Sequence, residues 1–251
     1  MLSILLSMGL LAGIVMVMDN PQQLVNQLWQ FNSFLLVVVG TFAATILQFP
    51  TRDCLKFFGW IWAAFRPKRV QFLADIHAFH TIAVTYQRDG VVGLTAILET
   101  VKSPFLSKAL NAVVDGATVA QVTDLCQQTT RSIKKRHELA IFFFEQMGKY
   151  APSFGLLGTV IGLIQLLAAL DSPSELGQGM ALALITTFYG ILLANGVFSP
   201  IAGRLYVLDQ HEERHNDMIT MGIREMMAGV SPLLIQEKML ATVHNRPTVV
   251  A

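Results

Sequence analysis

Two long uncharged stretches in the second half of the chain set the narrowest limit on its fold. Residues 150–170 and 179–201 contain no Asp, Glu, Lys, Arg or His, and only the short polar segment 171–178 separates them. Each stretch supplies the roughly 20 apolar residues that a helix needs to cross a ~30 Å hydrocarbon core. The sequence therefore predicts two transmembrane helices joined by a tight turn.

The composition of the whole chain agrees with a membrane protein. Charged residues make up only 14% of its 251 residues and hydrophobic residues 53%, whereas a soluble domain carries about 25% charged residues. The net charge of +1 gives no indication of nucleic-acid binding. Cys54 and Cys126 are too few and too far apart in sequence for a disulfide framework or a metal cluster, and we interpret both as reduced thiols.

The N-terminal fifth of the chain predicts two further spans. Residues 1–18 form an apolar run without the basic start and small-residue cleavage site of a secretory signal, which favours a retained first span. Residues 19–30 predict a short interfacial helix that contains Trp29, because Trp is favoured at membrane surfaces. Residues 31–49 predict the second span, which Pro50 ends.

The distribution of basic residues predicts the orientation. All 18 Lys and Arg residues lie outside the two short connections, 19–30 and 171–178. Cytoplasmic loops carry an excess of Lys and Arg, so residues 51–149 and the C-terminal tail are expected in the cytoplasm. The predicted protein is a multi-pass membrane protein with both termini inside.

The sequence also predicts helices in the long segment between the second and third spans. Helices are expected over residues 70–87, 91–101 and 105–114. Thr118 and Gln121 form a capping box that opens a long helix, with no stop signal before Pro152, so this helix is expected to run into the third span. After the fourth span, a charged helix is expected over residues 209–227, followed by a break at Gly229 and Pro232.

These predictions define an all-α, polytopic membrane protein with four transmembrane helices. We expect spans 1 and 2 in residues 1–50, a cytoplasmic helical domain in 51–148, spans 3 and 4 in 149–206, and a cytoplasmic tail in 207–251.

The last two spans carry small and hydroxyl residues but no ionisable group. Gly155, Gly158 and Gly162 allow another helix to approach closely, and we expect a partner helix to pack there. Proteins that move ions across membranes usually expose ionisable residues within their spans. If this chain belongs to an ion-driven system, its carboxylate must come from a partner. The alternative is that these small residues mediate helix packing within the chain.

Several sequence blocks resemble the MotA/PomA family, the larger membrane subunit of the bacterial flagellar stator. They are PSFGLLGTVIGL at 152–163, MALALITTFYGILLAN at 180–195 and FSPIA at 198–202, together with SFLLVVVGTFAATILQFP at 33–50. The resemblance implies a homo-oligomeric ring, a pentamer, around a MotB/PomB-type subunit that anchors to peptidoglycan and supplies the membrane aspartate. It further implies that H⁺ or Na⁺ flow turns the ring against the rotor switch protein, without enzymatic chemistry or a cofactor.

The resemblance also assigns roles to individual residues. Pro152 and Pro200 match the family's coupling prolines at the cytoplasmic ends of spans 3 and 4. Hydroxyls that face the ion path in the family are matched by Thr159, Thr186 and Thr187. Arg88 matches a rotor-contacting arginine. The family's glutamate eight residues later falls on Ala96, and Glu99 is the acidic candidate near it.

Two alternatives follow from other features. A related TolQ/ExbB-type energiser of envelope transport typically has three spans and an external N-terminus. The residues from His211 to His215 spell H-E-x-x-H, a zinc-protease pattern, although no third ligand is evident and the surrounding helix is charged on all sides. The basic run Arg131–Arg136 is expected to reflect topology and contact with anionic lipid.

Overall fold

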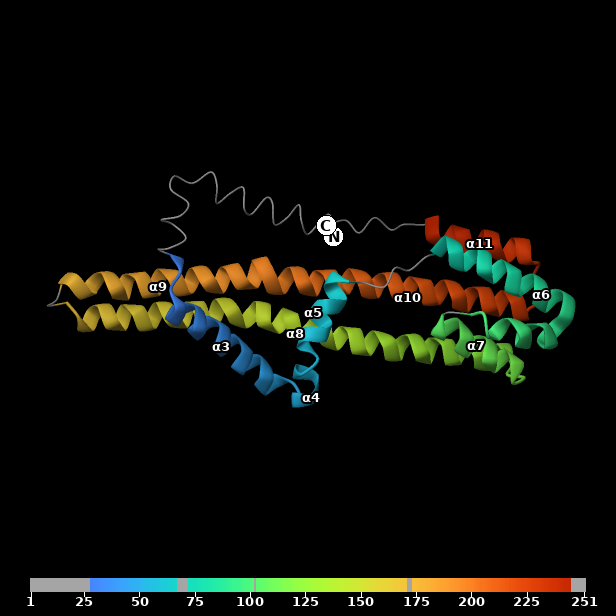
Figure 1. Cartoon of the computed structure of the whole chain (residues 1–251), viewed down its shortest axis with the longest axis horizontal. Coiled ribbons are helices and arrows are strands. Elements are labelled where there is room, and N and C mark those ends of the chain that lie inside the picture. Colours follow the sequence, from blue (N-terminus) through green and yellow to red (C-terminus); the bar gives the residue numbers. More distant parts are fainter. Residues whose placement is uncertain (1–27, 67–71, 102, 171–172, 245–251) are drawn as a thin grey trace. The chain divides into compact units, whose positions relative to one another are not determined.

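The computed structural model describes residues 28–66, 72–101, 103–170 and 173–244, which are helical with no strand in those ranges (Figure 1). The elements are α3 (Phe31–Gln48), α4 (Thr51–Cys54), α5 (Phe57–Phe65), α6 (Phe72–Leu98), α7 (Pro104–Val114), α8 (Val119–Ala168), α9 (Pro173–Leu193), the π-helical turn η1 (Ala194–Phe198), α10 (Ser199–Met227) and α11 (Pro232–His244). The all-helical class predicted from sequence is therefore confirmed for the described residues. The predicted first span, residues 1–18, lies outside them, as does nearly all of the predicted interfacial helix.

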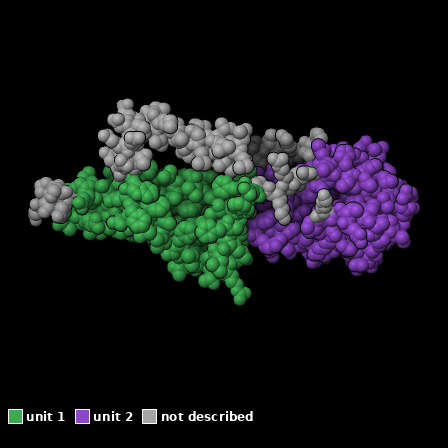
Figure 2. Space-filling view, viewed as in Figure 1, with its two compact units in different colours: residues 1–67, 139–205 green, residues 68–138, 206–251 purple. Residues whose placement is uncertain are grey.

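The described residues belong to two compact units (Figure 2). Unit 1 is built from residues of 1–67 and 139–205, and unit 2 from residues of 68–138 and 206–251. Helices α8 and α10 each contribute residues to both units.

Three described helices are long and apolar enough to cross a membrane: Phe31–Gln48, Val119–Ala168 and the continuous helical run Leu176–Met227. They contain the predicted spans 2, 3 and 4. Length and composition thus agree with a membrane protein in each of these three segments.

Helix α8 begins where the capping box predicts. The Thr118 N–H donates to Gln121 Oε1 at 2.8 Å, and the Gln121 N–H donates back to Thr118 Oγ1 at 3.4 Å. The helix then continues past Pro152 to Ala168, so the prediction of one unbroken helix into the third span is confirmed.

The predicted charged helix over residues 209–227 is confirmed and forms the larger part of α10, which ends at Met227. The structure has one helical run from α9 through η1 into α10, which begins at Ser199. The predicted break follows α10: Gly229 adopts φ +79, and the Val230 N–H donates to the Glu225 carbonyl, which is a glycine-ended helix terminus.

In unit 1, α3 packs through one narrow stripe. Ser33, Val37, Thr41 and Thr45 follow at four-residue intervals and are buried. The Thr41 hydroxyl donates to the Val37 carbonyl and the Thr45 hydroxyl to the Thr41 carbonyl, so this stripe presents no unpaired hydroxyl to lipid. A cluster of buried side chains centred on Phe143 and Phe144 packs beside Phe49 and α5.

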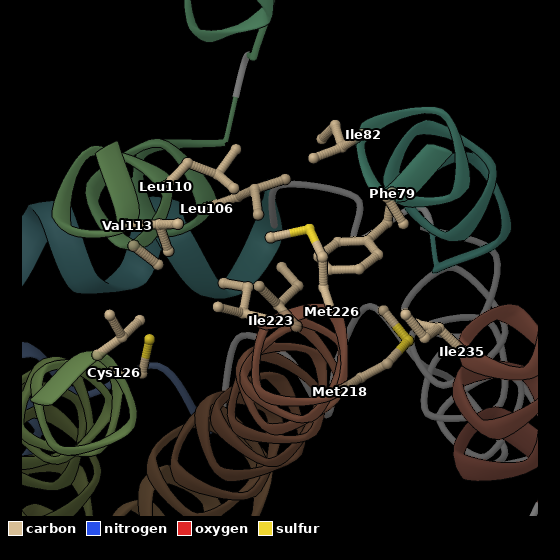
Figure 3. Close-up of a cluster of buried hydrophobic side chains, with 14 of the residues drawn as sticks. Phe79, Ile82, Leu106, Leu110, Val113, Cys126, Met218, Ile223, Met226 and Ile235 are labelled. Atoms are coloured by element: carbon tan, nitrogen blue, oxygen red, sulfur yellow. The ribbon is translucent and has the colours of Figure 1, made fainter. Parts of the chain in front are cut away.

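Unit 2 encloses a core of large apolar side chains from α6, α7, α8, α10 and α11 (Figure 3). Phe79, Leu110, Met218 and Ile235 are among the fully buried residues. The two predicted helices over 70–87 and 91–101 correspond to the two helical segments of α6, which Gly90 separates with a non-helical φ of 65 and ψ of −149. Only glycine adopts such a backbone conformation without strain.

Candidate functional site

The centre of the candidate site is a pair of threonines from two antiparallel helices of unit 1. Thr159 Oγ1 on α8 and Thr187 Oγ1 on α9 lie 2.5 Å apart. Each hydroxyl also lies 3.2 Å from the Ala183 carbonyl oxygen, and Thr159 lies at the same distance from the Gly155 carbonyl oxygen. Two of the three threonines predicted to face the ion path are thus in direct contact.

Three glycines allow α8 and α9 to approach this closely. A Cβ added to Gly155 would lie 3.0 Å from the Thr186 carbonyl oxygen, and one added to Gly162 would lie 2.6 Å from the Gly179 carbonyl oxygen. At Gly158 the added atom would meet the Thr186 side chain at 2.5 Å. The close approach predicted at these glycines is therefore used within the chain, which is the alternative that the sequence left open. Packing of a partner helix at the same glycines stays a prediction.

Thr186 is placed differently from its neighbour. It is 0% exposed, and its hydroxyl donates to the Leu182 carbonyl at 2.8 Å and to the Ala183 carbonyl at 3.1 Å. Its side chain lies against Gly158. Within this chain Thr186 is a packing residue between α8 and α9, whereas Thr159 and Thr187 are only partly buried.

Pro152 lies inside α8, and Pro200 lies in the first turn of α10. Each proline lacks the backbone N–H that would bond the carbonyl four residues earlier. Directly before Pro200, the helix widens into the π-helical turn η1, where the Ser199 N–H donates to the Ala194 carbonyl. The sequence analysis missed this turn. Its only signal is a proline late in an uninterrupted apolar stretch.

The outer faces of α8 and α9 carry large apolar side chains that the described residues of this chain do not cover. Lipid or another protein chain must cover a face of this kind in a membrane protein. The most exposed positions are Leu156, Ile164, Leu167, Leu170, Met180, Leu184 and Ile191.

The predicted rotor-contact residues both belong to unit 2 and are exposed. The Arg88 guanidinium on α6 pairs with the adjacent Asp89 at 2.7 Å. This hydrogen-bonded pair raises the pKa of Arg88 and lowers the pKa of Asp89. Glu99 directly follows the end of α6, beyond the bend at Gly90. The structure does not pair Arg88 with Glu99 among the described residues.

The H-E-x-x-H pattern places its two histidines in unlike surroundings. His215 is buried, and its Nε2 lies 2.8 Å from Asp75 Oδ2 on α6, whereas His211 is exposed. Within the described residues no group of three or more His, Cys, Asp or Glu side chains is arranged to hold a metal ion. The second histidine of the pattern therefore serves as a contact between α6 and α10.

Unit 2 also contains ion pairs that sequence reasoning missed. Lys134 on α8 bonds Glu213 on α10 at 2.8 Å, and His137 Nδ1 lies 2.8 Å from Asp209 Oδ1. The hydrogen bond that Lys134 donates to Glu213 raises the pKa of Lys134, and desolvation raises the pKa of Asp217. Only the antiparallel register of α8 and α10, which the sequence alone does not fix, brings these residues together.

The two cysteines are free. Burial raises the pKa of the Cys126 thiol, which lies in the core of unit 2, so this thiol is held in its unreactive form.

Comparisons with known proteins point to one family. Residues 98–218 match the model of the MotA/TolQ/ExbB proton channel family. "Motility protein A" of Borreliella burgdorferi is 30% identical over 212 residues, which cover 84% of this chain and 82% of that protein. The solved flagellar MotAB stator complex of Bacillus subtilis matches with a TM-score of 0.79 and 29% identity, over 85% of this chain and 84% of that chain. The C. jejuni MotAB structure matches with a TM-score of 0.87 at 22% identity, over 98% of this chain and 96% of that chain, which supports the fold alone.

Proposed function

The chain belongs to the motility protein A family, whose members are membrane subunits of the flagellar stator, and we propose how this member couples ion flow to torque. It is a non-enzymatic motor subunit. Together with a MotB-type partner it passes H⁺ or Na⁺ across the membrane and transmits the released energy to the rotor.

The first part of the proposal concerns the arrangement in the membrane. Four spans cross the inner membrane, residues 51–148 and 207–251 lie in the cytoplasm, and several copies form a ring, a pentamer, around the partner. The positive-inside distribution of Lys and Arg supports this orientation. The uncovered apolar faces of α8 and α9 support burial against neighbouring copies, the partner's helices and membrane lipid.

The observation that carries the coupling role is the contrast between polar and charged groups in the spans. Residues 150–170 and 179–201 contain no Asp, Glu, Lys, Arg or His, yet Thr159 and Thr187 bring hydroxyls together between two closely packed helices. The partner supplies the carboxylate that a cation needs, and the two hydroxyls, with Thr186 next to them, form the wall along which the ion passes. One elementary charge that crosses 100 mV releases roughly 2.3 kcal/mol.

Pro152 and Pro200 connect the spans to the cytoplasmic segments in this scheme. A proline removes one helix hydrogen bond and favours a bend at its position. The exposed Arg88, with Glu99 as a weaker acidic candidate, forms the contact with the rotor switch protein.

Co-reconstitution tests this function directly. Vesicles are prepared with the chain alone, with the chain and its MotB-type partner, and with a partner whose membrane aspartate is replaced by asparagine. We expect H⁺ or Na⁺ flux only in the second preparation. Equal flux from the chain alone would contradict the proposal, because the described spans contain no carboxylate of their own. Varying external Na⁺ at constant pH in the same vesicles identifies the ion.

A further inference from the structure

Two polar side chains near the cytoplasmic end of the last span have no hydrogen-bond partner among the residues that the structure describes. Asn195, in η1, is exposed and makes no side-chain hydrogen bond within the described part of the chain, and the same holds for the hydroxyl of Ser199. Lipid cannot satisfy such groups, and an unpaired polar group in hydrocarbon is strongly unfavourable. A partner group, water or an ion must therefore meet them in the membrane.

The backbone at the same place provides unpaired carbonyl oxygens. In η1 the Ser199 N–H bonds the Ala194 carbonyl, so it does not serve the carbonyl of Asn195 as it would in an α-helix. The next possible donor is residue 200, which is a proline and has no N–H. The Asn195 carbonyl is thus left without a helical donor.

The neighbouring helix α8 also lacks one backbone hydrogen-bond donor. Pro152 of α8 cannot donate to the carbonyl of Gly148 four residues earlier. A Cβ added to Gly148 would lie 3.2 Å from Ser199 Oγ, so the Ser199 hydroxyl lies beside this same residue. The two prolines therefore each remove a donor where α8 and α10 are in contact within unit 1.

The wide turn also brings Ser199 onto the face that carries the threonine pair. Thr187 and Ser199 are separated by twelve positions in the sequence, over which a regular α-helix turns about 120° beyond three full turns. One extra residue in the π-helical turn removes about 100° of that excess. Both ends of the stripe contact α8, Thr187 through Thr159 and Ser199 at Gly148. Asn195 lies between them.

We propose a second binding site for a small monovalent cation on the cytoplasmic side of the Thr159–Thr187 pair. Its oxygen ligands are the Asn195 amide and carbonyl, the Ser199 hydroxyl and the Gly148 carbonyl. This inference rests on the proposed function and locates the ion's exit. Irregular backbone at membrane depth is tolerated where it lines a water-filled cavity, and unwound carbonyls of broken helices coordinate Na⁺ or H⁺ in transporters. In this scheme the prolines act by exposing carbonyls as well as by shaping the helices.

The test uses the co-reconstituted complex with its MotB-type partner, with dyes inside the vesicles that report H⁺ and Na⁺ separately. Asn195→Leu removes the amide oxygen and fills its place with an apolar group of similar size. We expect flux to fall about tenfold or more, because a lost hydrogen bond to a charged group corresponds to roughly 1.5–3 kcal/mol. Val197→Leu, which changes an exposed apolar residue of the same turn, is the matched control and is expected to leave flux unchanged.

Two further variants separate ion contact from packing. Asn195→Asp keeps an oxygen at the site and adds a carboxyl, so flux is expected to persist at neutral pH and to fall as the carboxyl is protonated in acid. Pro200→Ala returns a backbone N–H that can bond a free carbonyl, and its flux is expected to fall less than that of Asn195→Leu. A purely structural role for Asn195 would not create the acid dependence.

Each outcome bears on the inference. Unchanged flux in Asn195→Leu, from a complex that copurifies with its partner in wild-type proportion, overturns it. Loss of flux together with loss of partner or of ring assembly also overturns it, because Asn195 would then be a contact between subunits. A wild-type complex that conducts no ion refutes the proposed function itself, and with it the proposed cation-binding site.

Discussion

Helices pack in opposite ways in the α8–α9 pair of unit 1 and in the core of unit 2. In the pair, Gly155, Gly158 and Gly162 bring one backbone against another, and the large apolar side chains point outward. In unit 2, large Phe, Ile, Leu and Met side chains point inward and fill the centre, while ion pairs such as Lys134–Glu213 lie at its margin.

The difference follows from the solvent that each region meets. In water the removal of apolar area from solvent drives packing, so the largest side chains are buried. In lipid a leucine gains nothing by burial, and helices associate through close backbone contact and hydrogen bonds between hydroxyls. Each region is therefore expected to be sensitive to a different kind of substitution.

The largest effect is expected from truncation in the unit 2 core. Phe79 is 1% exposed, and Phe79→Ala should lower the free energy of unfolding by about 3–5 kcal/mol, because it removes apolar contacts and leaves a cavity. Thermal unfolding of the purified full chain in detergent measures the change. Leu73→Ala, at an exposed position of the same helix, should change it by less than about 0.5 kcal/mol. Equal effects would contradict the assignment of this core.

An enlargement, not a truncation, should break the α8–α9 pair. Gly158→Val places methyl groups where the Thr186 side chain already lies, and overpacking of this kind costs about 1–3 kcal/mol or more. Thermal unfolding and ion flux of the complex should both decrease. Gly203→Val, at a position with nothing within 4 Å of the added Cβ, is the control. Tolerance of Gly158→Val would mean that α8 and α9 are not in close contact.

The two histidines of the H-E-x-x-H pattern should respond unequally. His215→Ala removes the buried contact with Asp75 and should cost about 1–3 kcal/mol of stability. His211→Ala changes an exposed residue and should be nearly neutral. Unfolding curves in the presence and absence of a chelator complete the test. Equal losses that depend on the chelator would favour a metal site over a structural contact.

The smallest effect concerns pH. Hydrogen bonds from Lys238 and Arg224 lower the pKa of Glu225 below its ordinary value. A lowered carboxyl pKa stabilises the folded state above the unfolded pKa, about 4.3, and this stability is lost as the pH falls through the lower folded value. Because the pair is partly exposed, we expect about 0.5 kcal/mol. Unfolding midpoints between pH 7 and pH 3 should show a smaller acid loss in Glu225→Gln than in wild type, whereas Glu237→Gln should follow wild type.

Most of the helical architecture could be predicted because its signals are local. The capping box at Thr118 marks the start of α8, and the break at Gly229 marks the end of α10. Apolar runs longer than a bilayer's thickness mark the spans. The contact between Thr159 and Thr187 was not predicted as such, although both residues were named as candidates.

The contacts that could not be predicted depend on the register between segments that are distant in the sequence. Nothing in the sequence specifies that Lys134 meets Glu213 or that His215 meets Asp75, because each pair requires the antiparallel offset of two helices. The same holds for the glycines of α8, whose role within the chain depends on the position of Thr186 opposite Gly158. The turn at η1 was missed for another reason: a proline predicts a lost hydrogen bond but not the form of the distortion.

The turn at Ala194–Phe198 also has a consequence for the length of this helix. The wide turn holds one residue more than an α-helical turn. It therefore absorbs the rotation of about 100° that this residue would otherwise add to all later positions, much as local unwinding absorbs inserted residues in a coiled coil. Deleting one residue there would restore a uniform α-helix and leave every later side chain at about the same angle to those before it, because the wide turn already offsets the rotation of about 100° that one residue adds. Single-residue gaps are therefore expected to be better tolerated in this short stretch than elsewhere in the run, where a gap puts all later side chains about 100° out of phase.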